Sequence, residues 1–168
     1  MNSHNHPALT SIGAWLWRWL AGIRIAEEPT EPGYGSAYAH LTLAPYEAIV
    51  TDHGRISSVK ASLPTTHGNI SLSWEFSGSS FHINTSLPPN TVAAVTLPHS
   101  AGRLWVELHE GDSLIYRDGE TALEVAARLE TVEGVHTVDR LDADHLVIRI
   151  GGGDYFFTAR LGPVDAES

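Results

Sequence analysis

The strongest constraint on the fold is a strict alternation of apolar and polar residues at residues 70–83. Ile70, Leu72, Trp74 and Phe76 alternate with serines and a glutamate, and Phe81 resumes the pattern after a turn at residues 77–79. A period of two places every second side chain on the same face of a β-strand. The segment therefore predicts a β-hairpin with one buried face and one face toward solvent.

The same pattern continues along the chain in short segments separated by turn residues. Candidate strands lie at residues 37–43, 49–53, 57–63, 91–97, 104–108, 113–116, 146–150 and 155–159. Short strands separated by regular turn signals are typical of sandwiches and barrels. We therefore predict a mainly β protein, with an antiparallel β-sandwich over residues 36–168. Residues 121–131 predict one short second helix, because Leu123, Ala126 and Ala127 fall at helical spacing.

Residues 11–25 predict a Trp-rich α-helix before the sandwich, with Gly22 and the later Pro29 as the signals that mark its end. Most of its apolar residues form one side of the helix, the main stripe, and Ala14, Trp17 and Ala21 make the opposite side apolar as well. Arg18 is the only charged residue between residues 12 and 23. Such a helix favours burial on more than one side, within a larger helical body or against another chain. The main stripe consists of Ile12, Trp15, Leu16, Trp19, Leu20 and Ile23.

A change of composition separates this helix from the strands. Residues 27–35 read EEPTEPGYG and combine acidic residues with Pro and Gly, which is typical of a linker. We therefore divide the chain into a terminal helix segment at residues 1–26, a linker at residues 27–35 and a sandwich domain at residues 36–168.

Charge and composition exclude several classes of function. The net charge is −10, with 20 acidic and 10 basic residues and no cysteine. We expect no nucleic-acid partner, because phosphate binding needs a basic surface. The apolar stretch at residues 12–25 is too short to span a bilayer, and no basic residue precedes it as in a signal peptide. These features predict no membrane association, no cofactor and a cytoplasmic location.

The residues that could carry chemistry form no complete site. The ten histidines are scattered singly, apart from His4 and His6, and favour surface positions over a metal site. Glycosidases need two positioned carboxylates, whereas Asp139, Asp142 and Asp144 lie in what the pattern predicts as a loop before a strand. We therefore expect no catalytic residue and no metal ligand in this chain.

The five tryptophans offer surfaces on which sugar rings could stack. Trp15, Trp19 and Trp74 each lie on the apolar phase of their segment, which favours a place in the core. The pattern does not decide whether Trp17 and Trp105 lie in the core or on the surface.

Two parts of the chain, taken in order, resemble bacterial α-L-rhamnosidases. The stretch NHPALTSIGAWLWRWLAGI at residues 5–23 resembles the last helical region of their catalytic barrel, with its Asn-His pair and its Trp-Leu-aromatic-Arg run. The second part comprises PGY at residues 32–34, AP at 44–45, GNISLSW at 68–74, LPPNTVAAVTLP at 87–98 and GGGDYFF at 151–157. It is similar to the C-terminal β-sandwich of the same family.

The resemblance implies a function for the chain as part of a larger enzyme. In that family an (α/α)6 barrel, upstream of the matched segment, holds the acid and base of an inverting glycoside hydrolase. The chain would thus hold the end of that barrel and a non-catalytic accessory sandwich, inactive alone. Its partner would be a rhamnosidase barrel or a second copy. The resemblance also places His6 at the sugar pocket, whereas an N-terminal histidine without a pocket is the alternative.

Two other functions remain open on the sequence. A carbohydrate-binding sandwich would present exposed aromatic side chains, for which Trp105, Tyr116 and Tyr46 are the candidates. An interaction domain would instead use the Trp-rich helix to dock onto a partner. The fold class alone does not choose between them.

Overall fold

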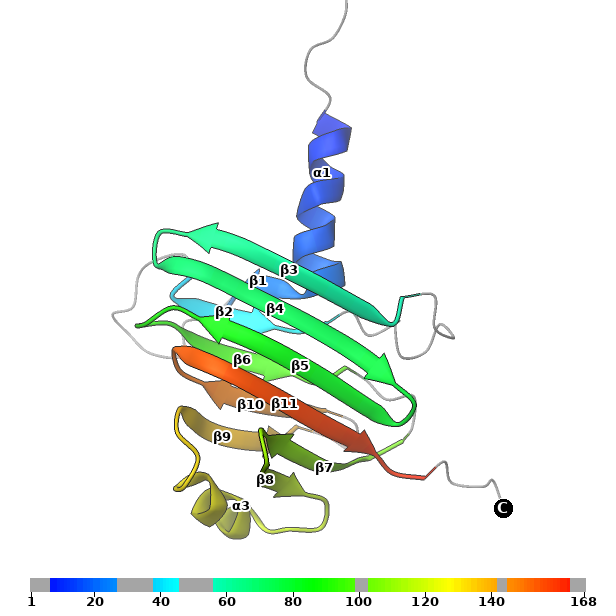
Figure 1. Ribbon diagram of the computed structural model, residues 1–168, viewed down its shortest axis with the longest axis vertical. Coiled ribbons are helices and arrows are strands. Elements are labelled where there is room, and N and C mark those ends of the chain that lie inside the picture. The colour runs from blue at the N-terminus through cyan, green and yellow to red at the C-terminus, as the bar shows by residue number, and fades with distance from the viewer. Residues whose placement is uncertain (1–6, 27–37, 46–55, 99–102, 142–144, 164–168) are drawn as a thin grey trace, which may run out of the picture.

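The computed structural model describes residues 7–26, 38–45, 56–98, 103–141 and 145–163. His6, the predicted linker at residues 27–35 and the predicted strand at residues 49–53 lie outside these ranges. Within them the chain is mainly β, as predicted, and is built from two layers of strands with a helix projecting from one end (Figure 1).

The strands described form two sheets that pack face to face. The five-stranded sheet has the order β1 (Ile23–Ile25), β2 (His40–Leu43), β6 (Val92–Thr96), β10 (Leu146–Ile150) and β9 (Val135–Arg140). The six-stranded sheet has the order β3 (Ser58–Thr65), β4 (Gly68–Ser77), β5 (Ser80–Leu87), β11 (Gly153–Leu161), β7 (Trp105–Glu110) and β8 (Ser113–Arg117). All their pairings are antiparallel except that of β2 with β6, which is parallel.

The predicted hairpin at residues 70–83 is confirmed as β4 and β5. Trp74 pairs with Ile83 and Phe76 with Phe81 across the hairpin. Ile70, Leu72 and Trp74 are at most 2% exposed, whereas the alternate residues face outward. The alternation of the sequence therefore sets which face of the six-stranded sheet meets the core.

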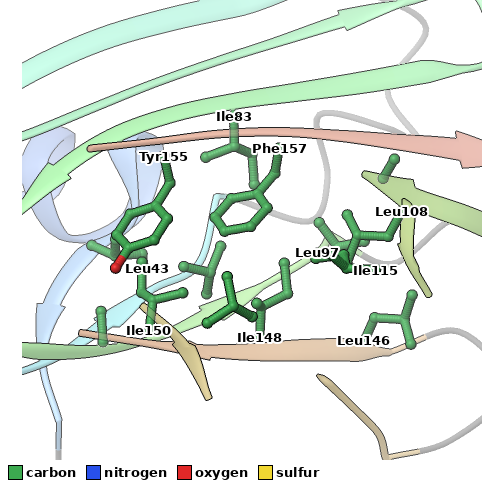
Figure 2. Packing of buried hydrophobic residues seen from close by; sticks show 14 of the residues in the cluster. Leu43, Ile83, Leu97, Leu108, Ile115, Leu146, Ile148, Ile150, Tyr155 and Phe157 are labelled. Carbon is green, nitrogen blue, oxygen red and sulfur yellow. The ribbon is translucent and has the colours of Figure 1, made fainter. Parts of the chain in front are cut away.

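The core is closed by the inward face of β11 against β10. Tyr155 and Phe157 of β11 point toward Ile148 and Ile150 of β10 (Figure 2). The two aromatic rings stack with centroids 5.7 Å apart. The Tyr155 hydroxyl lies 3.2 Å from the carbonyl oxygens of both Gly134 and Gly151. Burial raises the pKa of the Tyr155 hydroxyl.

The short helix predicted at residues 121–131 is confirmed as α3 (Ala122–Leu129). Thr121 caps it, because its side chain accepts a hydrogen bond from the Glu124 N–H while the Glu124 carboxylate accepts one from the Thr121 N–H. Val125 and Leu129 are buried on the side of α3 that faces the sandwich. At its start Glu120 accepts two hydrogen bonds from Arg128, at 2.6 and 2.7 Å, which lower the pKa of Glu120.

The N-terminal helix differs from its predicted limits. Helix α1 spans Pro7–Trp15 and continues as a π-helix, η1, over Leu16–Ala21. It starts at Pro7, before residue 11, and a proline is well tolerated in the first turn of a helix. The prediction of helix at residues 23–25 was wrong, because Gly22 adopts a left-handed conformation, with φ of 89°, that ends the helix. Ile23, Arg24 and Ile25 then alternate and pair with β2 as a strand.

Two further expectations were wrong. Asp139 lies in strand β9 and not in a loop, because Val135 is buried and residues 135–140 pair with β10. Trp15 and Trp19 do not lie in the core, and their exposed fractions are 46% and 47%. The reason is that the helix projects from the sandwich instead of lying along a sheet (Figure 1). Trp74 is buried as predicted.

We predict that truncating Phe157 and truncating its neighbour Phe156 have very different effects. Phe157 is 0% exposed and Phe156 is 42% exposed, on opposite faces of β11. Phe157→Ala should lower the free energy of unfolding by about 3–5 kcal/mol, because it leaves a cavity in the core. Phe156→Ala should lower it by much less, about 1 kcal/mol, because it removes a half-exposed ring that stacks on His82. Chemical denaturation measures both, and equal losses would contradict the assigned phase of β11.

Candidate docking surface

The most unusual surface of the molecule is the apolar side of the N-terminal helix. Four large side chains lie on it, and their exposed fractions are between 44% and 56%. In Figure 1 helix α1 extends away from both sheets, and the sandwich leaves about half of each of these side chains exposed. Contiguous exposed apolar groups of this size mark interaction sites. The four residues, which we call the helix stripe, are Ile12, Trp15, Leu16 and Trp19.

The base of the helix is anchored in the sandwich. Ala21 and Ile23 are buried, at 2% and 3% exposed, and Trp17 packs against the core cluster. The Ala44 N–H donates a hydrogen bond of 2.9 Å to the Gly22 carbonyl oxygen. Buried contacts at the C-terminal end of the helix therefore fix the direction in which it leaves the sandwich. They also fix the position of the helix stripe.

The last turns of the helix are wider than an α-helix. The Gly22 N–H donates to the Trp17 carbonyl oxygen, five residues back, as in a π-helix. The π-helix is rare, appears mostly as single turns within α-helices and is frequent at functional sites. Here Trp17 turns toward the core while Trp19 stays on the surface. The sequence alone gave no signal for this change of helix type.

An arginine side chain lies beside the helix stripe, at the end of the helix that joins the sandwich. The Arg24 guanidinium lies 5.1 Å from the ring centroid of Trp19, a cation–π distance. The Arg24 Nε is buried and has no hydrogen-bond partner among the described residues. A hollow of about 180 Å³ beside it is lined by Trp19, Arg24, Pro45 and Pro98, among others. A buried donor next to an exposed indole suits a partner that brings a carbonyl or carboxylate oxygen.

A second hollow lies where β2 and β6 begin and β10 ends. Its volume is about 600 Å³, and His40, His136 and Arg149 line it together with apolar residues. It thus brings together two histidines that the sequence left scattered. Among the residues described, no group of three or more His, Asp or Glu side chains could hold a metal ion. His6, the one predicted sugar-pocket residue, lies outside the described residues.

The aromatic residues proposed for an exposed sugar site are buried where they are described. Trp105 is 2% exposed and donates through Nε1 to the Pro98 carbonyl oxygen at 3.3 Å. Tyr116 is 5% exposed, and burial raises the pKa of its hydroxyl. Both lie on the inward side of the six-stranded sheet, so a sugar site built on them is wrong. Tyr46 lies outside the described residues.

Many acidic side chains of the described residues are held by arginines. Glu107 accepts from Arg117 at 3.4 Å and from Arg160 at 3.1 Å. Asp118 pairs with Arg140. These are surface ion pairs, which orient side chains and contribute little to stability. None of them forms the pair of facing carboxylates that a glycosidase uses.

No helix in the described parts of the chain is long and apolar enough to cross a membrane.

We predict opposite effects for alanine at the two glycines of the helix. A Cβ at Gly22 would lie 2.2 Å from the Ala44 carbonyl oxygen, on a backbone with φ of 89°. Gly22→Ala should lower the free energy of unfolding by at least about 2 kcal/mol. A Cβ at Gly13 would meet nothing within 4 Å, so Gly13→Ala should raise helix stability by up to about 1 kcal/mol. Thermal unfolding followed by circular dichroism tests both variants. An unchanged stability of Gly22→Ala would contradict the left-handed turn at Gly22 that joins the helix to the sandwich.

Comparison with known proteins agrees with this architecture. The family model for the bacterial alpha-L-rhamnosidase C-terminal domain matches residues 22–112, starting at the glycine that ends the helix. An alpha-L-rhamnosidase of Streptomyces avermitilis is 33% identical over 98 residues, which cover 58% of this chain and 8% of the relative. One of Formosa agariphila is 31% identical over 98 residues, covering 58% and 9%. The chain thus matches less than a tenth of the length of these curated relatives.

Solved structures extend the likeness to the helix. The alpha-L-rhamnosidase of Dictyoglumus thermophilum matches with a TM-score of 0.66 and 26% identity, over 95% of this chain and 14% of that one. The helix is a larger share of the chain than the uncovered 5%, so the match reaches into it. The Streptomyces avermitilis enzyme complexed with L-rhamnose shares the fold, with a TM-score of 0.58 over 94% of this chain and 12% of that one. Since the family model covers more than half of its residues, the chain belongs to the bacterial α-L-rhamnosidase C-terminal domain family.

Proposed function

We propose that the chain is the non-catalytic C-terminal part of an α-L-rhamnosidase-like glycoside hydrolase, and that its helix stripe docks onto a catalytic barrel. The barrel would hydrolyse terminal α-L-rhamnose by attack of water with inversion. The observation that carries the proposal is the exposed apolar side of a helix whose base is fixed in the sandwich. The sandwich would act as a buttress that holds this helix in place.

The size of the helix stripe supports a permanent partner. Complete burial of a large apolar side chain contributes about 1.5–3 kcal/mol, and the four side chains are each about half exposed. Covering them would therefore contribute roughly 3–6 kcal/mol. That is a large share of the stability of a domain, so leaving the stripe in water is costly.

The relatives support the same arrangement. Each relative reported above is a much longer chain named as an alpha-L-rhamnosidase, and this chain matches 8–14% of its length. In such a chain the matched segment is accompanied by a larger body that can cover the helix.

We predict that the chain works only when joined to a barrel. The purified chain should not hydrolyse an aryl α-L-rhamnoside. A chimera in which this chain replaces the matching segment of the Dictyoglumus thermophilum enzyme should hydrolyse it. Trp15→Glu with Trp19→Glu should destabilise that chimera by at least about 3 kcal/mol, because two indoles lose their apolar contacts.

The matched control is Leu123→Glu, which changes a leucine that is 80% exposed on α3, at the far end of the molecule from α1 (Figure 1). It should shift the stability of the chimera by less than about 0.5 kcal/mol. Turnover by the isolated chain would refute the non-catalytic role. Equal stability of the double glutamate variant and the control would refute docking, as would a dimer of the isolated chain that covers the helix stripe.

A further inference from the structure

The outward face of the six-stranded sheet carries a row of polar side chains around one exposed aromatic ring. Lys60 pairs with Ser73, Ser73 with Asn84, and Asn84 with Phe156, so these four residues lie side by side across β3, β4, β5 and β11. They face outward because Leu72, Trp74, Ile83 and Phe157 on the alternate phase are buried. Four neighbouring strands make the row roughly 14 Å wide.

The aromatic ring belongs to a preformed platform. Phe156 stacks on His82, with centroids 6.0 Å apart and planes within 6° of parallel. The His82 ring is held by Thr158, because His82 Nδ1 lies 3.1 Å from the Thr158 Oγ1. Phe156 is nevertheless 42% exposed. A large apolar ring that is held by a neighbouring ring and remains partly exposed can serve as a stacking surface.

The short side chains beside the ring leave room for a ligand. Two adjoining hollows, of about 510 and 410 Å³, both include Lys60, Ser73, Asn84 and Phe156 in their lining. They therefore form one continuous surface feature, which we call the polar groove. Serine and asparagine leave this space, whereas the long side chains common on exposed sheet faces would fill it.

The chemistry of the polar groove suits a neutral oligosaccharide. We propose that it binds one, with a sugar ring stacked on Phe156 and its hydroxyls bonded to Ser73, Asn84 and Lys60. Hydroxyl and amide groups can both donate and accept, as a sugar hydroxyl requires. Three carboxylates, of Glu75, Glu110 and Asp154, also line the hollows against the single lysine. This balance disfavours an anionic saccharide.

The polar groove is independent of the docking proposal. The helix stripe lies on α1 and η1, and none of its residues lines either hollow. A failure of helix docking would therefore leave saccharide binding untouched, and the reverse also holds.

The test is a titration of the isotope-labelled full chain, followed by amide NMR. The probes are L-rhamnose, cellohexaose and xylohexaose, with trigalacturonate as the anionic comparison. At least one neutral probe should shift the amides of Ser73, Asn84 and Phe156, with affinity in the millimolar range or tighter. Phe156→Ala should weaken that binding roughly fivefold to tenfold, since a stacking contact is lost.

Two controls separate a loss of binding at the polar groove from a general effect of mutation. Leu123→Ala, on the distant helix α3, should bind as the unchanged chain does, and Phe156→Ala should keep its fold because the ring is on the surface. The proposal is overturned if no neutral probe shifts the groove amides, if Phe156→Ala binds equally well, or if trigalacturonate binds more tightly than every neutral probe.

Discussion

The packing of β11 on β10 is the contact on which the rest of the molecule depends. β11 lies between β5 and β7, and its inward residues Tyr155 and Phe157 close the core over β10. A strand has only two faces, so the burial of Phe157 forces Phe156 outward. The same strand therefore fixes both the stability of the sandwich and the aromatic platform of the polar groove.

The helix is held to this sandwich by a second constraint, the left-handed Gly22. Its carbonyl accepts the Ala44 N–H, and Ile23 follows directly into the five-stranded sheet. The sandwich thereby orients a helix whose apolar side it leaves about half exposed. In the π-helical turn Trp17 packs against the core. Trp19 stays at the surface, where its ring contacts Arg24. A further body packed against the helix would bury the exposed half of the helix stripe.

Much of the fold follows from the sequence because local alternation carries it. The β4–β5 hairpin is set by residues close in the chain, and α3 by a capping box at Thr121. Strand β9 was missed because its alternation is weak and polar residues dominate its end. The burial predicted for Trp15 was wrong because periodicity identifies an apolar side but not what covers it.

The candidate sites were harder to predict for a related reason. The outward phase of Phe156 could be derived from the buried phase of β11, but its neighbours Asn84 and Ser73 are distant in the chain. Only the order of strands in the sheet brings them together. Likewise, nothing local shows that Arg24 lies over Trp19, since the left-handed turn at Gly22 separates helix from strand.

The central claim is that the helix stripe is an interface with a catalytic barrel. Hydrogen–deuterium exchange of the helix backbone, in the isolated chain and in the rhamnosidase chimera, tests it most directly. The account predicts that amides of α1 exchange rapidly in the isolated chain and become strongly protected in the chimera, while those of β4 and β11 are equally protected in both. Equal exchange of α1 in the two proteins would contradict the claim.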